Sequence, residues 1–190
     1  IRKFTKTPWT PIQLLLFKTL SAEMLAYLWL LLQYKMNLLL IGGTSSGKTT
    51  LLNAIAFFIP PEARIVSIED TRELNLAKDN WLPSVVRTAT GAGTTGEIDL
   101  FALLKASFRQ NPDYVIVGEV RGKEAYVLFQ GMASGHSSIS TIHADSVESI
   151  TAKGASIYTL SEKGNNSKLA KQLEQSQNLV DQFGGVETVI

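Results

Sequence analysis

Residues 38 to 50 of the chain read Leu38-Leu39-Leu40-Ile41-Gly42-Gly43-Thr44-Ser45-Ser46-Gly47-Lys48-Thr49-Thr50. The run fits the pattern G-x-x-x-x-G-K-[ST], with an apolar strand-like segment before it and a helix-compatible segment after it. This context separates a phosphate-binding loop from a chance match. The alternative, a plain Gly/Ser-rich turn, leaves the lysine and the hydroxyl unexplained. We therefore predict that the chain binds a nucleoside triphosphate together with Mg²⁺.

The loop has the residue types that a triphosphate requires. Glycines at 42, 43 and 47 let the chain curl so that successive backbone amides point inward, and a helix that starts near Gly47 adds its positive dipole end. Lys48 is expected to reach the β- and γ-phosphates, and the hydroxyl of Thr49 is expected to bind Mg²⁺. The predicted nucleotide-binding residues are Gly42, Thr44, Ser45, Ser46, Gly47, Lys48, Thr49 and Thr50.

The composition is that of a folded globular chain. Its 190 residues, 45% of them apolar, predict one domain with or without appendages. A net charge of +1 predicts no strong attraction to nucleic acid or to anionic membranes. The absence of cysteine excludes a disulfide framework and a cysteine-based zinc site.

The ends and the most apolar region of the sequence suggest neither a signal peptide nor a membrane span. The chain starts with Ile1 instead of Met, which we interpret as the start of an excised fragment. Residues 24–41 are the most apolar, but polar residues between 33 and 37 leave stretches too short to cross a bilayer. We interpret this region as a buried helix followed by a buried strand.

Strand and helix signals alternate along the rest of the chain. They predict helices over 11–17, 21–34, 48–58, 98–110 and 123–134, and strands over 37–41, 64–68, 114–117 and 138–142. Thr10 and Ser21 are expected to cap the first two helices. Residues 71–96 are expected to be irregular, with a mobile loop at 90–96. This alternation predicts an α/β three-layer domain with a mostly parallel central sheet.

In such a sheet, ligands bind at the carboxyl ends of the strands. Glu69 and Asp70 directly follow one predicted strand, where a carboxylate can hold Mg²⁺ through water or activate the attacking water. The alternative is a pair of solvated loop acids. Glu119 ends the apolar run 114–117 as in a Walker B strand; Gly118 stands where the usual Asp would be, so Glu119 must act alone.

Four more residues leave alternatives open. His143 directly follows the last predicted strand, where its imidazole can bind the γ-phosphate or be satisfied by backbone. His136, seven positions earlier, has the same two alternatives. Metal binding by the histidines is disfavoured because no further ligands accompany them. Arg121 and Glu124 could reach a neighbouring subunit or could be helix N-terminal charges.

These motifs, in this order, resemble those of the secretion ATPase superfamily, the hexameric motors of type II secretion, type IV pili, type IV secretion and the archaellum. The matching segments are 42–49 for Walker A, 68–73 for the Asp box, 109–121 for the Walker B region and 135–144 for the His box. The residues in and around these motifs are most similar to those of the archaeal branch. The similarity includes Asn53-Ala54, Ile59-Pro60-Pro61-Glu62 and Asn80-Trp81. The resemblance covers residues 1–150.

The resemblance implies a RecA-like P-loop ATPase, the C-terminal domain of a protein that works as a cytoplasmic homo-hexamer. Its cofactors would be ATP and Mg²⁺, and its partner a membrane platform protein at the inner face of the cell membrane; no nucleic acid is expected. Lys48 and Thr49 would bind the phosphates and Mg²⁺. Glu69 would be the better general-base candidate, with Glu119 assisting Mg²⁺ or the water, although these roles could be exchanged. His143 would contact the γ-phosphate.

Two departures from the family qualify this picture. The N-terminal domain that closes over ATP would be represented only by its last linker, up to about Pro11, so the fragment is expected to bind nucleotide but hydrolyse it poorly. Residues 151–190 resemble nothing in the family and suggest a polar helix over 168–183 and a strand over 186–190. They could be a lineage-specific ending, an engineered splice or a frame error.

The domain plan is therefore a linker with helices over 1–33, an ATPase core over 34–150 and an atypical tail over 151–190. The leading hypothesis is a motor for pilus assembly or secretion. The alternative is a nucleotide-binding ring-assembly module with little turnover of its own. A motor acting on nucleic acid is disfavoured by the near-zero charge and the lack of a basic-aromatic stripe.

Overall fold

The computed structural model describes residues 7–88 and 96–143. Contacts divide the chain into two units, residues 1–149 and residues 150–190. The second unit lies outside the described residues, and so do the predicted helix over 168–183, the strand over 186–190 and most of the loop predicted at 90–96. Those expectations stay predictions.

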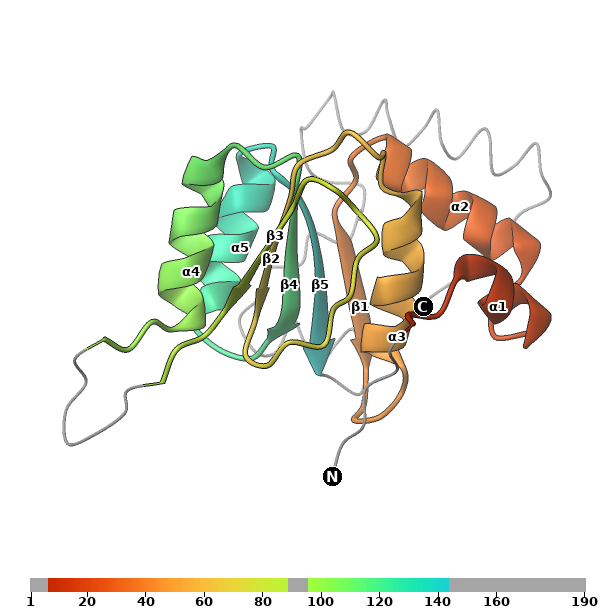
Figure 1. Ribbon diagram of the computed structural model, residues 1–190, viewed down its shortest axis with the longest axis horizontal. Helices are drawn as coiled ribbons and strands as arrows, with labels where there is room; N and C mark the ends of the chain where they lie inside the picture. Colours follow the sequence, from red (N-terminus) through yellow and green to blue (C-terminus); the bar gives the residue numbers. More distant parts are fainter. Residues whose placement is uncertain (1–6, 89–95, 144–190) are drawn as a thin grey trace, which may run out of the picture. The chain divides into compact units, whose positions relative to one another are not determined.

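A five-stranded sheet forms the centre of the first unit (Figure 1). Its strand order is β1-β5-β4-β2-β3, and every neighbouring pair is parallel. Because all strands run the same way, their carboxyl ends share one edge. The strands are β1 (Leu38–Gly42), β2 (Ile65–Glu69), β3 (Trp81–Val85), β4 (Tyr114–Val120) and β5 (Ser137–His143).

Helices cover both faces of this sheet. In Figure 1, α2 and α3 lie on one face, and α4 and α5 lie on the other. The α/β three-layer prediction with a parallel sheet is thereby confirmed. The helices are α1 (Pro11–Leu16), α2 (Ala22–Gln33), α3 (Lys48–Ile55), α4 (Leu100–Ser107) and α5 (Glu124–Ala133), with 3-10 turns η1 (Ala56–Phe58) and η2 (Phe108–Gln110).

Both predicted N-caps are confirmed. Thr10 and Gln13 form a reciprocal capping box at the start of α1, where Pro11 is the first helical residue. The side chain of Ser21 accepts a hydrogen bond of 3.2 Å from the backbone N–H of Met24 at the start of α2. These local interactions explain why the two helices begin where the sequence predicted.

Strand β3 corrects the prediction that residues 71–96 are irregular. Among the described residues it pairs with β2 alone, in register opposite Ile65–Glu69, and so forms one edge of the described sheet. Pro83, which argues against a central strand, is tolerated at an edge because no ladder partner needs its missing N–H. Trp81 anchors the strand through a 2.8 Å hydrogen bond from its Nε1 to Ser67 Oγ.

The core lies between the sheet and the α2–α3 layer. Leu32, Leu52 and Ile55 are fully buried there against the sheet residues Ile116 and Ile139. Every residue of β2 is buried, as expected for a strand covered on both faces. The short strands are therefore held mainly by apolar burial.

A buried hydroxyl links this layer to the sheet. Tyr114, at the start of β4, donates from its hydroxyl to the carbonyl oxygen of Leu32 near the end of α2. Burial raises the pKa of Tyr114 to about 12. The phenol therefore stays protonated and keeps donating at any ordinary pH.

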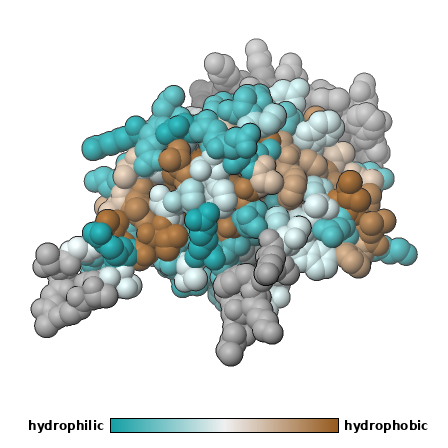
Figure 2. All heavy atoms as spheres, viewed as in Figure 1, coloured by the Kyte–Doolittle hydropathy of each residue, from teal (hydrophilic) through white to brown (hydrophobic). Residues whose placement is uncertain are grey.

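Apolar side chains remain exposed on α1, where Ile12 and Leu16 are 68% and 73% accessible. Figure 2 shows hydrophobic residues at this side of the unit, on the right of the view. In the part of the chain that the structure describes, no helix combines the length and the apolar character needed to cross a membrane.

Candidate functional site

The phosphate loop has the predicted strand–loop–helix context. Strand β1 ends at Gly42 and α3 begins at Lys48. Two residues of the loop are left-handed, Ser45 with φ 61° and Gly47 with φ 96°. A Cβ on Gly42 would lie only 2.6 Å from Ser46 Oγ. Glycine is therefore favoured at 42, because a Cβ there would force Ser46 to move, and at 47 for backbone conformation.

Lys48 lies over the loop that precedes it. Its Nζ donates to the carbonyl oxygens of Gly42 at 2.8 Å and Gly43 at 2.7 Å. The N-cap residue of α3 is Gly47, so no capping side chain bonds the amides of the first helical turn. The ammonium group and the positive end of the helix together favour an anion at this loop.

The structure brings His143 to the phosphate loop and leaves His136 far from it. His143 is the register partner of Gly42, and its Nδ1 lies 3.5 Å from Thr44 Oγ1. His136 precedes the other end of β5, about 20 Å away at the usual rise per residue. There it packs against the ring of Phe108, with centroids 4.7 Å apart, and its Nδ1 lies 3.3 Å from Gly131 O. His136 thus has the structural role, satisfied by backbone, that the sequence left open.

Glu69 ends β2 in a closed environment, only 2% exposed. Its Oε1 accepts hydrogen bonds of 2.8 Å from the backbone N–H groups of Glu73 and of Leu74. Its buried Oε2 has no hydrogen-bond partner among the described residues. Burial raises the pKa of this carboxyl above the ordinary 4.5, although the two amide bonds oppose the shift. A Cβ on Gly118 would lie 3.1 Å from Glu69 Cγ, so β4 closes the site from one side.

Glu119 lies on an irregular part of β4. The register with β5 pairs Val117 with Ser140 and Val120 with Ile142, so Gly118 and Glu119 form a bulge. The side chain of Glu119 is 27% exposed, far more open than Glu69. Thr141 Oγ1 donates to Gly118 O at 2.7 Å and fixes the bulge to β5. Bulges often redirect a side chain next to a functional site, and this one leaves the carboxylate of Glu119 open to solvent.

Arg121 and Glu124 make contacts within the chain. Glu124 is buried, and its Oε1 accepts from the backbone N–H groups of Arg121 at 2.6 Å and Gly122 at 2.7 Å. For Glu124 the structure therefore favours the helix N-terminal role. The guanidinium of Arg121 pairs with Glu119 and, at 3.4 Å, with Asp70.

Asn53 is not among the site residues predicted from the sequence. This buried amide donates to Thr49 O at 3.1 Å and accepts from Asn75 N at 2.9 Å. It thereby joins the helix of the phosphate loop to the segment whose amides hold Glu69. Its sequence signal was a single amide within the apolar run 51–55.

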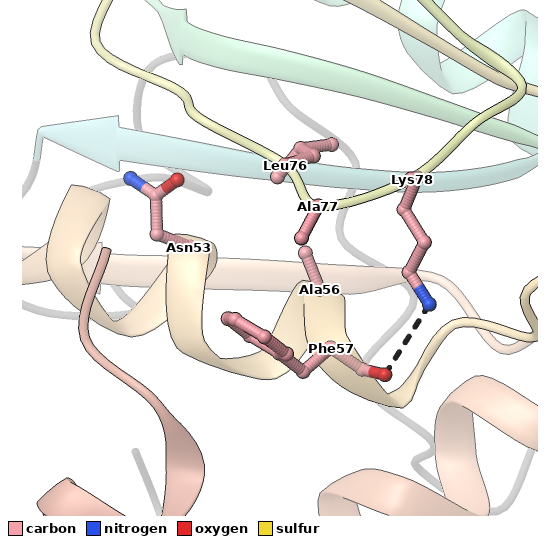
Figure 3. Close-up of a pocket in the computed structure, with 6 residues that line it drawn as sticks. All are labelled: Asn53, Ala56, Phe57, Leu76, Ala77 and Lys78. Carbon is pink, nitrogen blue, oxygen red and sulfur yellow. Dashed lines mark hydrogen bonds between the residues drawn. The ribbon is translucent and has the colours of Figure 1, made fainter. Parts of the chain in front are cut away.

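A shallow, solvent-open pocket lies at the other end of α3, too small to enclose a water molecule. Figure 3 shows its walls, which come from α3, η1 and the segment before β3: Asn53, Ala56, Phe57, Leu76, Ala77 and Lys78. Lys78 Nζ donates to Phe57 O at 3.3 Å, as Figure 3 also shows. This pocket does not include the phosphate loop, and we do not assign the nucleotide to it.

Comparisons with known proteins agree with this arrangement. The model of the type II/IV secretion system protein family matches residues 1–181, beyond residue 150, where the sequence alone suggested no resemblance. An uncharacterized protein of Methanocaldococcus jannaschii is 52% identical over 140 residues, covering 74% of this chain and 52% of that protein. The type IV secretion system protein PtlH of Bordetella pertussis is 45% identical over 113 residues, covering 58% of this chain and 33% of PtlH.

The fold comparison points the same way. The crystal structure of the VirB11 ATPase from the Brucella suis type IV secretion system, in complex with sulphate, matches with a TM-score of 0.59 and 31% identity. The match covers 76% of this chain and 41% of that structure. The chain thus spans about half the length of the Methanocaldococcus relative and less of the other two. Its similarity to the Methanocaldococcus protein fits the archaeal-like branch.

Proposed function

The chain belongs to the type II/IV secretion system protein family, and on that premise we propose that it is an ATP-hydrolysing motor module. It would power pilus or archaellum assembly, or protein secretion through a type II or type IV system. The observation that supports this best is the shared edge of the parallel sheet. The phosphate loop follows β1, Glu69 ends β2, Glu119 lies near the end of β4 and His143 ends β5.

The residues at this edge fit ATP with Mg²⁺. Lys48 holds its ammonium on two loop carbonyls, and it would give these up for β- and γ-phosphate oxygens. A Cβ on Gly42 would lie 2.6 Å from Ser46 Oγ, so a side chain at this one position would crowd the loop. Mg²⁺ is usually bound through one or two protein groups together with phosphates and water, and Thr49 and Glu119 would supply them. Bound Mg²⁺ would neutralise charge on the transferred phosphoryl group.

We propose that Glu119, besides binding near Mg²⁺, orients and deprotonates the attacking water, and that Glu69 positions the site. The general-base role thereby moves from Glu69 to Glu119. A general base must reach the proton before its pKa matters. Glu69 has a raised pKa, as a base often does, but its Oε1 is held by two amides and the group is buried. Glu119 is the more accessible carboxylate. His143, next to Thr44, would contact the γ-phosphate.

The wider setting is part of the same proposal. The protein would act as a cytoplasmic homo-hexamer, at the inner face of the membrane, through a membrane platform protein and without nucleic acid. Support comes from the similarity to PtlH and VirB11, which are named as proteins of type IV secretion systems.

A binding titration tests the nucleotide assignment. A fluorescent ATP analogue with Mg²⁺ should bind the wild type, and Lys48→Ala should bind about tenfold to a hundredfold more weakly, because a charge-assisted contact is lost. Lys123→Gln, which removes an exposed cation paired with Asp99, is the matched control and should bind as the wild type does. Equal binding by Lys48→Ala would contradict the phosphate-loop assignment.

Measurements of ATP turnover distinguish the roles of Glu119 and Glu69, and they distinguish a motor from a ring-assembly module. With the N-terminal domain added in trans, Glu119→Gln should lower kcat by about a hundredfold or more, as expected for loss of a general base. A normal kcat in Glu119→Gln with a large loss in Glu69→Gln would restore the original assignment. Nucleotide binding without turnover under any of these conditions would favour the ring-assembly module.

A further inference from the structure

Arg121 lies between two acids of adjacent strands, Glu119 within β4 and Asp70 directly after β2. We propose that its guanidinium competes with the Mg²⁺ of the bound nucleotide for Glu119, so that Arg121 restrains this carboxylate until the Mg²⁺-nucleotide complex binds. The inference rests on the proposed nucleotide function. It assigns to Arg121 a positioning role and a regulatory one.

The contacts define the restraint. Arg121 Nη2 pairs with Glu119 Oε2, and Nη1 lies 3.4 Å from Asp70 Oδ2. Glu119 belongs to the bulge of β4, whereas Asp70 directly follows β2, so the guanidinium bridges the ends of two adjacent strands. The arginine thereby occupies one oxygen of the carboxylate that we assign to water activation and to Mg²⁺.

The ion pairs of Arg121 can break without a change in the backbone. The backbone N–H of Arg121 is fixed by the buried carboxylate of Glu124 at 2.6 Å, but its side chain is 64% exposed. An exposed guanidinium can leave its partner for water at little cost, because ion pairs of this kind are weak. Arg121 can therefore swing away while its backbone and the start of α5 stay in place.

Electrostatics gives the size of the effect. The guanidinium of Arg121 and a divalent cation would both be attracted to the carboxylate of Glu119, and they would repel each other. An exposed ion pair contributes a factor of about two to five in an equilibrium constant. Removing the guanidinium should therefore strengthen the contribution of Mg²⁺ to nucleotide binding by about twofold to fivefold.

The test measures binding, so it does not depend on turnover. The dissociation constant of a non-hydrolysable fluorescent ATP analogue is measured with Mg²⁺ and with EDTA. The constant in EDTA divided by the constant in Mg²⁺ gives the Mg²⁺ coupling. In Arg121→Gln this ratio should rise by about twofold to fivefold over the wild type. In Arg121→Lys, which keeps the charge without the planar fork, the rise should be smaller. Thermal unfolding of both variants should match the wild type, because the side chain is exposed.

Lys123→Gln is the control for a general charge effect. Lys123 is 70% exposed, lies two residues away and pairs with Asp99 at 2.7 Å, so the ratio should stay at the wild-type value. An unchanged ratio in Arg121→Gln, a fall in that ratio, or an equal rise in Lys123→Gln would each overturn the proposal. If the wild type itself binds no better than Lys48→Ala, the proposed function fails and this inference fails with it. Normal binding without the Arg121 effect overturns the inference alone.

Discussion

Replacing Gly118 by alanine tests how closely β4 packs against Glu69. An alanine Cβ would lie 3.1 Å from Glu69 Cγ, and 3.6 Å from both Glu69 Cβ and the carbonyl oxygen of Ile68. The first separation is short of the ordinary carbon–carbon distance of about 3.5 Å. Glu69 cannot easily retreat, because two amide bonds of 2.8 Å hold its Oε1 and the residue is 2% exposed.

The expected cost follows from two opposing effects. Overpacking at a rigid buried site costs about 1–3 kcal/mol, and the lower chain entropy of alanine in the unfolded state returns about 0.4–1 kcal/mol. Gly118→Ala should therefore lower the free energy of unfolding by about 1–2 kcal/mol. With a urea m-value of about 2 kcal/mol per molar, the unfolding midpoint should fall by about 0.5–1 M, measured by tryptophan fluorescence.

A double-mutant cycle decides whether the clash with Glu69 is the cause. In a Glu69→Ala background the Cγ atom is gone, so the additional change Gly118→Ala should cost almost nothing. Gly43→Ala is the steric control, because a Cβ there meets no heavy atom within 4 Å. If Gly118→Ala is equally destabilising with and without the Glu69 side chain, the packing argument is refuted.

Three further predictions concern the same framework. Tyr114→Phe should lower the free energy of unfolding by only about 1 kcal/mol, seen as a small fall in Tm, because Leu32 O still accepts from Lys35 N at 3.0 Å; a much larger loss would refute this. Burial raises the pKa of Glu69, so its protonation stabilises the fold fully below the unfolded pKa of about 4.5, and that stability is lost as the pH rises through the folded pKa. Urea titrations of Glu69→Gln should therefore show a smaller decline in the free energy of unfolding between mildly acidic and neutral pH. An unchanged decline would contradict the raised pKa of Glu69. Gly47→Ala should cost about 1–2 kcal/mol in unfolding experiments from left-handed backbone strain alone, since φ is 96° and no atom obstructs a Cβ; no loss of stability would show that the loop has another conformation.

Short-range patterns in the sequence were enough to predict much of the fold and the ligand class. The phosphate loop, the two helix caps and the buried strands rest on residues within a few positions of one another, where local geometry and burial act directly. The same patterns predicted that Glu69, Glu119 and His143 follow strands that end at one edge. They failed at β3, because an edge strand with Pro83 has neither a continuous apolar run nor a clear alternation.

The accessibility of each acid and its partner depends on which strands become neighbours. Gly118 closes over Glu69 because β4 lies beside β2, and His143 reaches Thr44 because β5 lies beside β1. Asn53 and Arg121 likewise contact residues more than 20 positions away or on another strand. Residues 38–50 by themselves therefore predict an anion at Lys48. The packing of distant segments determined which carboxylate is open to solvent at that edge, because burial and contact are properties of the folded sheet.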